Sequence, residues 1–168
     1  GKLPALWKTS VYDSRPLQEL VRKNLDPTKV AGSGKKIAVG AVSITTGRYR
    51  VWRQSDVDFV NGVIASSSFP AFFTPIKIDG ELWTDAGVQE ITPIEEAIRL
   101  GAKKIHVINC SPEKTILWSD KTPTVPGIAM RVIELMSADI ARWDYKVTEL
   151  YNKDDGKIKV DLSETGIK

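Results

Sequence analysis

Cysteine and histidine, the residue types that most often build metal sites and catalytic triads, are nearly absent from this sequence. Its 168 residues include one cysteine, Cys110, and one histidine, His106. A single cysteine excludes an internal disulfide and a cysteine-rich zinc site, and it fits a reducing compartment. His106 lies in the apolar run Lys-Ile-His-Val-Ile-Asn, which predicts a buried core histidine. A Ser-His-Asp triad is therefore not expected, and any serine chemistry would need another base.

Long hydrophobic runs are also absent. No segment reaches the length of a transmembrane helix, and the first ten residues lack the apolar core of a signal peptide. These absences predict a soluble, cytoplasmic chain, with peripheral membrane contact left open. The net charge of +3 is small and its basic residues are scattered, so we expect solvated faces and no nucleic-acid partner. Strand alternation would place Arg48, Arg50 and Trp52 on one face.

Helical and strand patterns alternate along the chain and predict an α/β layered domain with a largely parallel sheet, formed by residues 1–168 as a single domain. Helical spacing or helix-start signals are present at 14–25, 55–66, 92–101 and 127–151. Strand patterns are present at 36–45, 48–53, on both sides of Asp79-Gly80, at 103–110 and at 157–162. The run 103–110 is expected to be a parallel strand covered on both faces.

The helix ends carry their own signals. Ser14 and Ser55 are expected to be N-caps, and Thr92, Pro93 and Glu95 match a capping box at the start of a helix that Gly101 ends. The long helix is expected to bury one apolar stripe, consisting of Ile128, Val132, Leu135, Met136, Ile140, Trp143, Val147 and Leu150.

Two motifs resemble phosphate chemistry and are better explained by local structure. The run Asp-Val-Asp-Phe-Val at 56–60 matches aspartate-nucleophile phosphatases, but no apolar strand precedes it. A helix start, with Asp56 and Asp58 in its first turn, explains these acids better. The glycine-rich stretch 31–36 lacks the first glycine and the final Ser or Thr of a phosphate loop, so we expect a flexible loop.

Asp85 is the most informative polar residue. It follows a short apolar run and precedes the small pair Ala86-Gly87. It could cap a turn, since Asp is common in turns. Asp79-Gly80 already supplies the hairpin turn, however, and a carboxylate at a strand end could accept a proton from a nearby hydroxyl. Spacing alone leaves both interpretations open.

The stretch from 65 to 110 resembles the C-terminal portion of patatin-like phospholipases. The shared features occur in the same order and are specific only as a set. They are Ala65-Ser66-Ser67, Pro70, Phe72-Phe73, Pro75, Asp85-Ala86-Gly87, Thr92-Pro93 and Gly101-Ala102. The segment 11–21 also looks like one that those proteins carry. This resemblance implies a three-layer α/β/α fold and a hydrolase that cleaves acyl esters of lipids with a Ser-Asp dyad. Asp85 would be the aspartate, and no metal or organic cofactor would be needed.

The chain departs from the family pattern in two respects. Glu90 and Ile91 stand where the family usually has Asp-Asn. The Gly-x-Ser-x-Gly nucleophile turn and the glycine-rich oxyanion loop occur nowhere in the chain. Ser67 lacks flanking glycines and Ser33 has no preceding strand, so neither is a candidate nucleophile.

The resulting hypothesis is that this chain is the C-terminal part of a patatin-like acyl hydrolase and is inactive alone. A missing N-terminal segment or a partner chain would supply the serine, and the chain would expose apolar surface and tend to associate. Phe69, Phe72 and Phe73, with Ala86 and Gly87, are candidates for the acyl pocket, with core packing as the alternative for the phenylalanines. The competing hypothesis is a non-catalytic module that binds a lipid or a protein.

Overall fold

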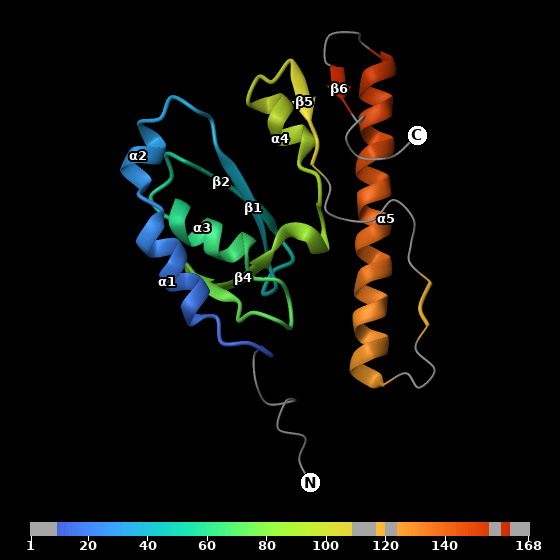
Figure 1. Ribbon diagram of the computed structural model, residues 1–168. Helices are drawn as coiled ribbons and strands as arrows, with labels where there is room; N and C mark the ends of the chain where they lie inside the picture. Colours follow the sequence, from blue (N-terminus) through green and yellow to red (C-terminus); the bar gives the residue numbers. More distant parts are fainter. Residues whose placement is uncertain (1–9, 109–116, 120–123, 155–158, 162–168) are drawn as a thin grey trace. The chain divides into compact units, whose positions relative to one another are not determined.

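The computed structural model describes residues 10–108, 117–119, 124–154 and 159–161 (Figure 1). Cys110 and the side chain of Leu150 lie outside the described part. The chain divides into two compact units, residues 1–89 (unit 1) and residues 90–168 (unit 2), and each is described by itself. The predicted single-domain organisation stays a prediction.

Each predicted helix and strand is present, several of them shorter than predicted, and one short helix is added. Unit 1 contains α1 (Arg15–Asn24), α2 (Pro27–Ala31), β1 (Ala38–Ser43), β2 (Tyr49–Arg53), α3 (Phe59–Ser66), β3 (Ile76–Ile78), β4 (Glu81–Asp85) and the 3-10 turn η2 (Ala86–Val88). Unit 2 contains α4 (Ile94–Arg99), β5 (Lys104–His106), α5 (Val125–Asp154) and β6 (Lys159–Asp161). The helix that the sequence did not predict is α2, whose N-cap Asp26 accepts hydrogen bonds from the backbone N–H groups of Thr28 and Lys29.

The predicted mostly parallel sheet is wrong for unit 1. Its four strands have the order β2-β1-β4-β3, and every neighbouring pair is antiparallel. The reason is that β1–β2 and β3–β4 are hairpins joined by tight turns, which force neighbouring strands to run in opposite directions. The one parallel pair among the described strands is β5 with β6 in unit 2. The chain is thus a mixed α/β protein, and the three-layer arrangement stays a prediction.

Both predicted hairpin turns are confirmed. Gly47 has φ 73° between β1 and β2, and Asp79 and Gly80 have φ 51° and 83° between β3 and β4. Two successive residues with positive φ form the type of two-residue turn whose twist matches that of the two strands it joins. Asp and Gly tolerate this conformation better than other residues, which is why the Asp-Gly pair was readable in the sequence.

Neither predicted serine N-cap makes a capping hydrogen bond. Ser14 occupies the N-cap position of α1 as predicted, but its Oγ instead accepts a hydrogen bond of 2.6 Å from the backbone N–H of Thr74. Helix α3 begins at Phe59 and not at residue 55, because the Asp56 carboxylate accepts from the backbone N–H of Arg53 at 2.9 Å. This interaction forms a separate turn before the helix, so Asp56 and Asp58 do not occupy its first turn.

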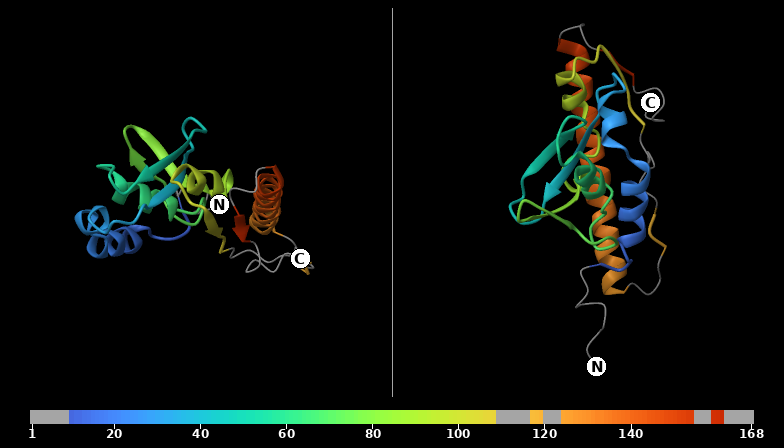
Figure 2. Two further views of the ribbon diagram at one scale, coloured as in Figure 1. Left: turned by 90° about the horizontal axis from the view of Figure 1, so that it is seen from above. Right: turned by 90° about the vertical axis from the view of Figure 1, so that its left-hand side faces the viewer.

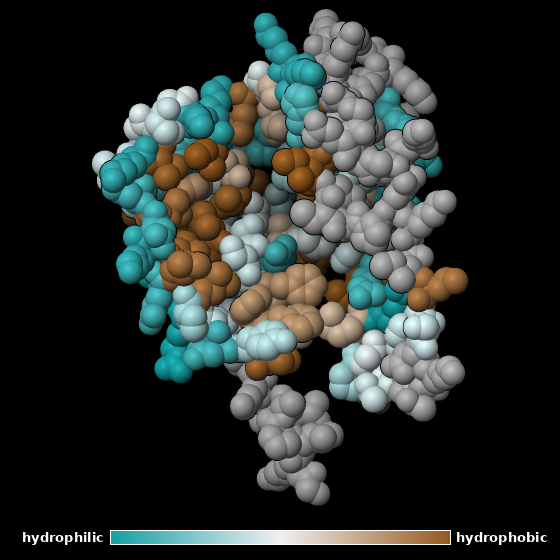
Figure 3. All heavy atoms as spheres, viewed as in Figure 1, coloured by the Kyte–Doolittle hydropathy of each residue, from teal (hydrophilic) through white to brown (hydrophobic). Residues whose placement is uncertain are grey.

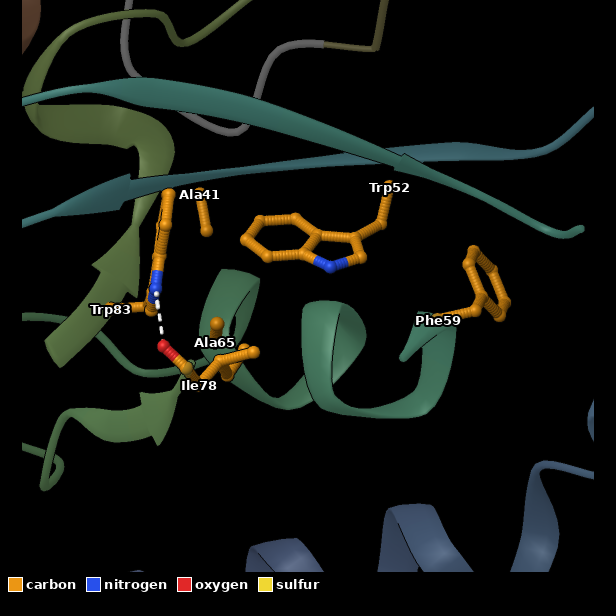
Figure 4. Packing of buried hydrophobic residues seen from close by; sticks show 6 residues of the cluster. All are labelled: Ala41, Trp52, Phe59, Ala65, Ile78 and Trp83. Carbon is orange, nitrogen blue, oxygen red and sulfur yellow. Dashed lines mark hydrogen bonds between the residues drawn. The ribbon is translucent and has the colours of Figure 1, made fainter. Parts of the chain in front are cut away.

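The core of unit 1 lies between one face of the sheet and α3 (Figure 4). Trp52 of β2 and Trp83 of β4 meet edge to face, with ring centroids 4.9 Å apart and an interplanar angle of 82°. The Trp83 Nε1–H donates to the carbonyl oxygen of Ile78 at 3.3 Å. Two buried indoles in this geometry contribute several kcal/mol of stability, on the order of 3–5 kcal/mol each when truncated to alanine. Figure 2 shows the resulting layers, with α3 on the sheet and α1 outside α3.

Gly62 sets how closely α3 approaches the sheet. A Cβ atom at this position would lie 2.6 Å from Cγ of Trp52, closer than any relaxed contact. The helix backbone therefore rests directly on the indole, and glycine is the residue that permits it. In Figure 3 apolar side chains gather on the side of unit 1 where α1, α2 and α3 lie in Figure 1.

Unit 2 has a smaller core, and the buried face of α5 differs from the predicted one. Ala141 and Tyr145 of α5 pack with Ile94, Ile105 and Val107. Of the predicted inward residues, six are exposed and one, Ile140, is partly buried, while Leu150 cannot be assessed; the exposed ones are Ile128, Val132, Leu135, Met136, Trp143 and Val147. The amphipathic spacing identified a helix with an apolar row, but the prediction that this row packs inside the protein is wrong. A different side of α5 contacts the rest of unit 2.

The strand β5 is shorter and less buried than predicted. Ile105 and Val107 are buried, but Lys104, His106 and Ile108 are exposed. His106 is therefore not a core histidine. The run 103–110 reads as apolar, but β5 alternates between a buried and an exposed face.

We expect Gly62→Ala to lower the free energy of unfolding by about 1–3 kcal/mol, because the added methyl group must displace the Trp52 ring. Urea unfolding followed by tryptophan fluorescence measures this change. Combining Gly62→Ala with Trp52→Phe should recover part of the loss, since the smaller ring leaves room for the methyl group. Strict additivity of the two effects would contradict this account of their contact.

Candidate active site at the end of strand β4

Asp85 is the last residue of β4 and the point where the chain leaves the sheet. It pairs with Ala41 of the central strand β1, so its backbone is held in the middle of the sheet. Its Oδ1 accepts a hydrogen bond of 2.7 Å from the backbone N–H of Gly87 and so caps the turn η2. Asp85 thus caps a turn, which is one of the two roles that the sequence left open, and this does not exclude a chemical role.

Only one of the two carboxylate oxygens has this role. Within the described residues, no hydrogen-bond donor reaches Oδ2 of Asp85, and the side chain is about half-buried. Burial raises the pKa of Asp85 above its ordinary value, and the Gly87 N–H offsets part of that increase. A carboxylate with a raised pKa is a better proton acceptor near neutral pH than an ordinary surface aspartate.

The backbone of Asp85 is fixed by the segment that follows α3. The carbonyl oxygen of Ser68 accepts from the Asp85 N–H at 3.0 Å and from the Thr84 hydroxyl at 2.5 Å. Thr84 is fully buried, so its hydroxyl has no access to water as an alternative partner. These two hydrogen bonds tie the end of β4 to the end of α3.

The serines beside this contact are not oriented for chemistry. The hydroxyl of Ser67 donates to the carbonyl of Val63 and that of Ser68 to the carbonyl of Ile64, both at 2.8 Å. Ser33, in the glycine-rich stretch, likewise donates to the carbonyl of Val30 at 2.7 Å. Each hydroxyl satisfies a carbonyl of its own helix end, which agrees with excluding Ser67 and Ser33 as nucleophiles.

The three phenylalanines after Ser68 form a partly exposed aromatic cluster with Tyr12. The sequence analysis did not identify Tyr12 as a site residue. Tyr12 stacks on Phe72 with a centroid distance of 5.9 Å and lies 6.1 Å from Phe73, and Phe69 lies 5.8 Å from Phe72. None of the four belongs to the buried core cluster. The three phenylalanines are partly buried, and their role as pocket residues or as packing residues stays a prediction.

A short backbone pairing holds this aromatic cluster in place. The N–H groups of Val11 and Tyr12 donate to the carbonyls of Ala71 and Phe72 at 2.8 and 2.9 Å. Ala71 has φ 67°, a conformation that costs a non-glycine residue on the order of 1 kcal/mol. The pairing with residues 11–12 keeps the loop in this strained shape. In the sequence, the only signal for Val11 and Tyr12 was the resemblance of the segment 11–21 to patatin-like phospholipases.

The two small residues of the predicted pocket lie beside the carboxylate. Ala86 is buried and Gly87 is partly buried in the turn that Asp85 caps. The backbone N–H of Gly87 is already used by Oδ1 of Asp85. The pair therefore contributes a tight turn and little side-chain volume directly after Asp85.

In unit 2 the predicted capping box is wrong. The N-cap of α4 is Pro93, and the Glu95 carboxylate accepts from Arg99 at 2.6 Å and makes no cap. The segment is held instead by Asp144 of α5, which accepts from the backbone N–H groups of Ile91 and Thr92 at 3.2 and 2.9 Å. Burial raises the pKa of Asp144, and the hydrogen bonds from residues 91 and 92 oppose that shift. Gly101, with φ 90°, follows the last turn of α4 and ends this helix as predicted.

The basic residues predicted on one strand face are engaged within the sheet. Arg48 forms an ion pair of 2.9 Å with Glu81, and the Arg50 guanidinium lies over the Trp52 ring at 4.5 Å. Trp52 itself is buried. The described residues contain no cluster of histidine, cysteine or carboxylate side chains that could hold a metal ion. No helix among them is long and apolar enough to span a membrane.

A comparison with known protein families finds a match. A family model described as patatin-like phospholipase matches residues 2–98, a range that includes Asp85, Ala86 and Gly87. No curated protein matches the chain.

Because burial raises the pKa of Asp85, ionisation of this group is less favourable in the folded protein than in the unfolded chain. The stability associated with the neutral carboxyl is complete below the unfolded pKa of about 3.9 and is lost as pH rises through the higher folded pKa. We therefore expect Asp85→Asn to be more stable than the original chain at neutral pH, with a difference that shrinks as pH falls. Urea unfolding at a series of pH values measures it.

The matched control is Asp79→Asn on the exposed hairpin turn, which removes one negative charge without relieving a buried one. This control should not reproduce the pH-dependent gain. A stability difference for Asp85→Asn that shrinks as pH rises would contradict the direction of the pKa shift.

We expect Thr84→Val to lower the free energy of unfolding by about 1–2 kcal/mol, because it removes the hydroxyl that bonds to the Ser68 carbonyl. Thr84→Ser keeps the hydroxyl and serves as the comparison. Chemical denaturation of both variants measures the difference. A loss in Thr84→Ser with none in Thr84→Val, which keeps the methyl group, would show that methyl packing and not the hydrogen bond matters at this position.

Proposed function

Since the chain belongs to the patatin-like phospholipase family, a family of lipid acyl hydrolases, we propose that Asp85 is the general base of a Ser-Asp dyad. The observation that carries this proposal is the asymmetry of its carboxylate. Oδ1 is fixed by the Gly87 N–H, and no donor among the described residues reaches Oδ2. A fixed carboxylate with one open oxygen and a raised pKa has the properties that a general base requires.

The chemistry follows from that open oxygen. Oδ2 accepts the proton of a serine hydroxyl while the serine oxygen attacks the ester carbonyl carbon. The protonated carboxyl then returns the proton to the departing alcohol, leaving an acyl-serine. In the second half of the reaction the same oxygen takes a proton from the water that attacks the acyl carbon. It returns that proton to the serine oxygen as the bond to the acyl group breaks and the fatty acid departs. Each proton moves through one group, and no histidine is needed.

We propose that the nucleophile and the oxyanion donors come from a segment outside these 168 residues or from a partner chain. The sequence contains no Gly-x-Ser-x-Gly, and the hydroxyls of Ser33, Ser67 and Ser68 donate to nearby helix carbonyls. Residues 1–168 alone should therefore be inactive toward esters.

The aromatic cluster is the proposed acyl-binding surface. The backbone N–H of Asp85 bonds to Ser68, and Phe69 is the next residue, so the cluster begins beside the base. Tyr12 is exposed, the three phenylalanines are partly buried, and none of the four belongs to the core cluster, which leaves ring surface available to an acyl chain. Aromatic side chains such as Tyr12 also suit the boundary between lipid and water, so transient contact with a membrane surface fits the same patch.

In the complete protein we expect Asp85→Asn to reduce kcat for a short-chain ester by about 10³-fold or more, with KM changed far less. The substitution keeps the cap on Gly87 and removes only the basic oxygen, so the fold stays intact. Release of 4-nitrophenol from its short-chain esters measures the rate. Asp79→Asn, in the same unit, is the control and should keep full activity.

Two outcomes would overturn the proposal. One is equal activity of the complete protein and its Asp85→Asn variant. The other is an upstream reading frame that encodes neither a Gly-x-Ser-x-Gly turn nor a glycine-rich loop. If the complete protein binds phospholipid vesicles but hydrolyses no ester, the non-catalytic module is the correct description.

A further inference from the structure

Ser68 joins the end of helix α3 to the end of strand β4. It is buried, with 1 % of its surface exposed. Its backbone N–H donates to the carbonyl oxygen of Ala65 at 3.0 Å, and its hydroxyl donates to that of Ile64 at 2.8 Å. Its own carbonyl oxygen accepts from the Asp85 N–H and from the Thr84 hydroxyl. Ser68 is thus hydrogen-bonded to the helix through its donors and to the strand through its acceptor.

The Ser68 carbonyl takes the place of a missing strand beside Asp85. Strand β3 pairs with β4 only as far as Trp83, whereas β1 continues alongside β4 to Asp85. An N–H group at the end of a strand needs a partner when the neighbouring strand stops short of it. The Asp85 N–H finds this partner in Ser68, at 3.0 Å. The backbone of the candidate base is therefore held by β1 on one edge and by the chain after α3 on the other.

The Thr84 hydroxyl adds a second bond to the same carbonyl oxygen. The two atoms are 2.5 Å apart, and Thr84 is 1 % exposed. A β-branched side chain has little freedom at χ1, and a buried hydroxyl has no water as an alternative partner, so its direction is fixed. A carbonyl oxygen can accept two hydrogen bonds. Two donors from adjacent residues converge on one oxygen and hold the peptide between Thr84 and Asp85 more tightly than one bond would.

We propose that Thr84 is a positioning residue for the base, an inference that rests on the proposed role of Asp85. Successive strand residues point to opposite faces, so the Thr84 side chain lies on the face opposite to the Asp85 carboxylate and acts only through the backbone. The Ser68 carbonyl holds the Asp85 N–H, and the Gly87 N–H holds its Oδ1 at 2.7 Å. Together they fix the direction of Oδ2. A displacement of about 1 Å at a catalytic group can cost about 100-fold in rate.

Kinetics of the complete protein test this role. We expect Thr84→Val, which keeps the shape of the side chain, to lower kcat for a short-chain 4-nitrophenyl ester by about 10- to 100-fold with KM nearly unchanged. Thr84→Ser keeps the hydroxyl and should retain most of the activity. An unchanged kcat in Thr84→Val would overturn the proposal.

A matched variant separates positioning from general loss of stability. Val42 is buried and pairs with Thr84 on the neighbouring strand, so Val42→Ala weakens the same part of the sheet without removing the hydroxyl. It should keep its kcat at a temperature where circular dichroism shows all variants to be folded. Equal losses of kcat in Val42→Ala and Thr84→Val would show that packing alone is responsible.

A double-mutant cycle tests whether Thr84 acts through Asp85. In the Asp85→Asn background, Thr84→Val should cause no further loss of rate, because the group that it positions is already gone. A further loss by the same factor would contradict the proposal. If Asp85→Asn itself were fully active, the proposed function would fail. A large loss in Asp85→Asn with none in Thr84→Val would remove the positioning role alone.

Hydrogen exchange of the 168-residue chain gives an answer that needs no activity. In Thr84→Val the amides of Asp85 and Gly87 should exchange about tenfold faster than in Thr84→Ser. The amide of Ser43, which donates to Arg48 in the same sheet, is the internal reference and should change far less. Equal acceleration at Ser43 and Gly87 would mean that the substitution only destabilises the unit as a whole, and the proposal would be wrong.

Discussion

The close approach of α3 to the sheet is the constraint on which the rest of unit 1 depends. The helix backbone rests on the Trp52 indole because Gly62 has no side chain to hold the two apart. That depth brings the end of α3 level with the end of β4, where the Ser68 carbonyl receives hydrogen bonds from Thr84 and Asp85. A helix displaced outward by even one methyl group would move this carbonyl away. Packing in the middle of α3 thus helps to fix the backbone of the candidate base, which bonds to the chain just after the helix ends.

Asp85 combines two roles that oppose each other energetically. As a cap it stabilises the turn through the Gly87 N–H, and this hydrogen bond favours the charged carboxylate. As a half-buried group it is disfavoured in that same charged form, and burial is the larger of the two effects. The cap fixes the side chain at one oxygen, while burial keeps the other oxygen a good proton acceptor. A residue that served only the turn would gain nothing from its burial.

Local patterns in the sequence predicted the parts of the fold that local forces determine. The hairpin at Asp79-Gly80 was readable because few residues adopt positive φ, and the long helix because its spacing extends over many turns. Long-range choices were not readable. The apolar row of α5 does not say which face meets its own unit, and the acid that holds residues 91 and 92 is Asp144, more than 50 residues further along the chain. Asp85 was identified as a candidate because it stands alone at a strand end, but its cap on Gly87 needed the backbone geometry.

The contact between Gly62 and Trp52 also has a consequence for how related sequences can diverge. The indole and the missing side chain share a single volume, so neither position can change independently. A lineage that keeps tryptophan at 52 is restricted to glycine at 62, and a larger residue at 62 requires a smaller one at 52. The two positions should therefore co-vary, although they lie in different elements and neither takes part in the chemistry. Substitutions at this pair would therefore reflect changes in how the helix packs on the sheet and not changes in substrate.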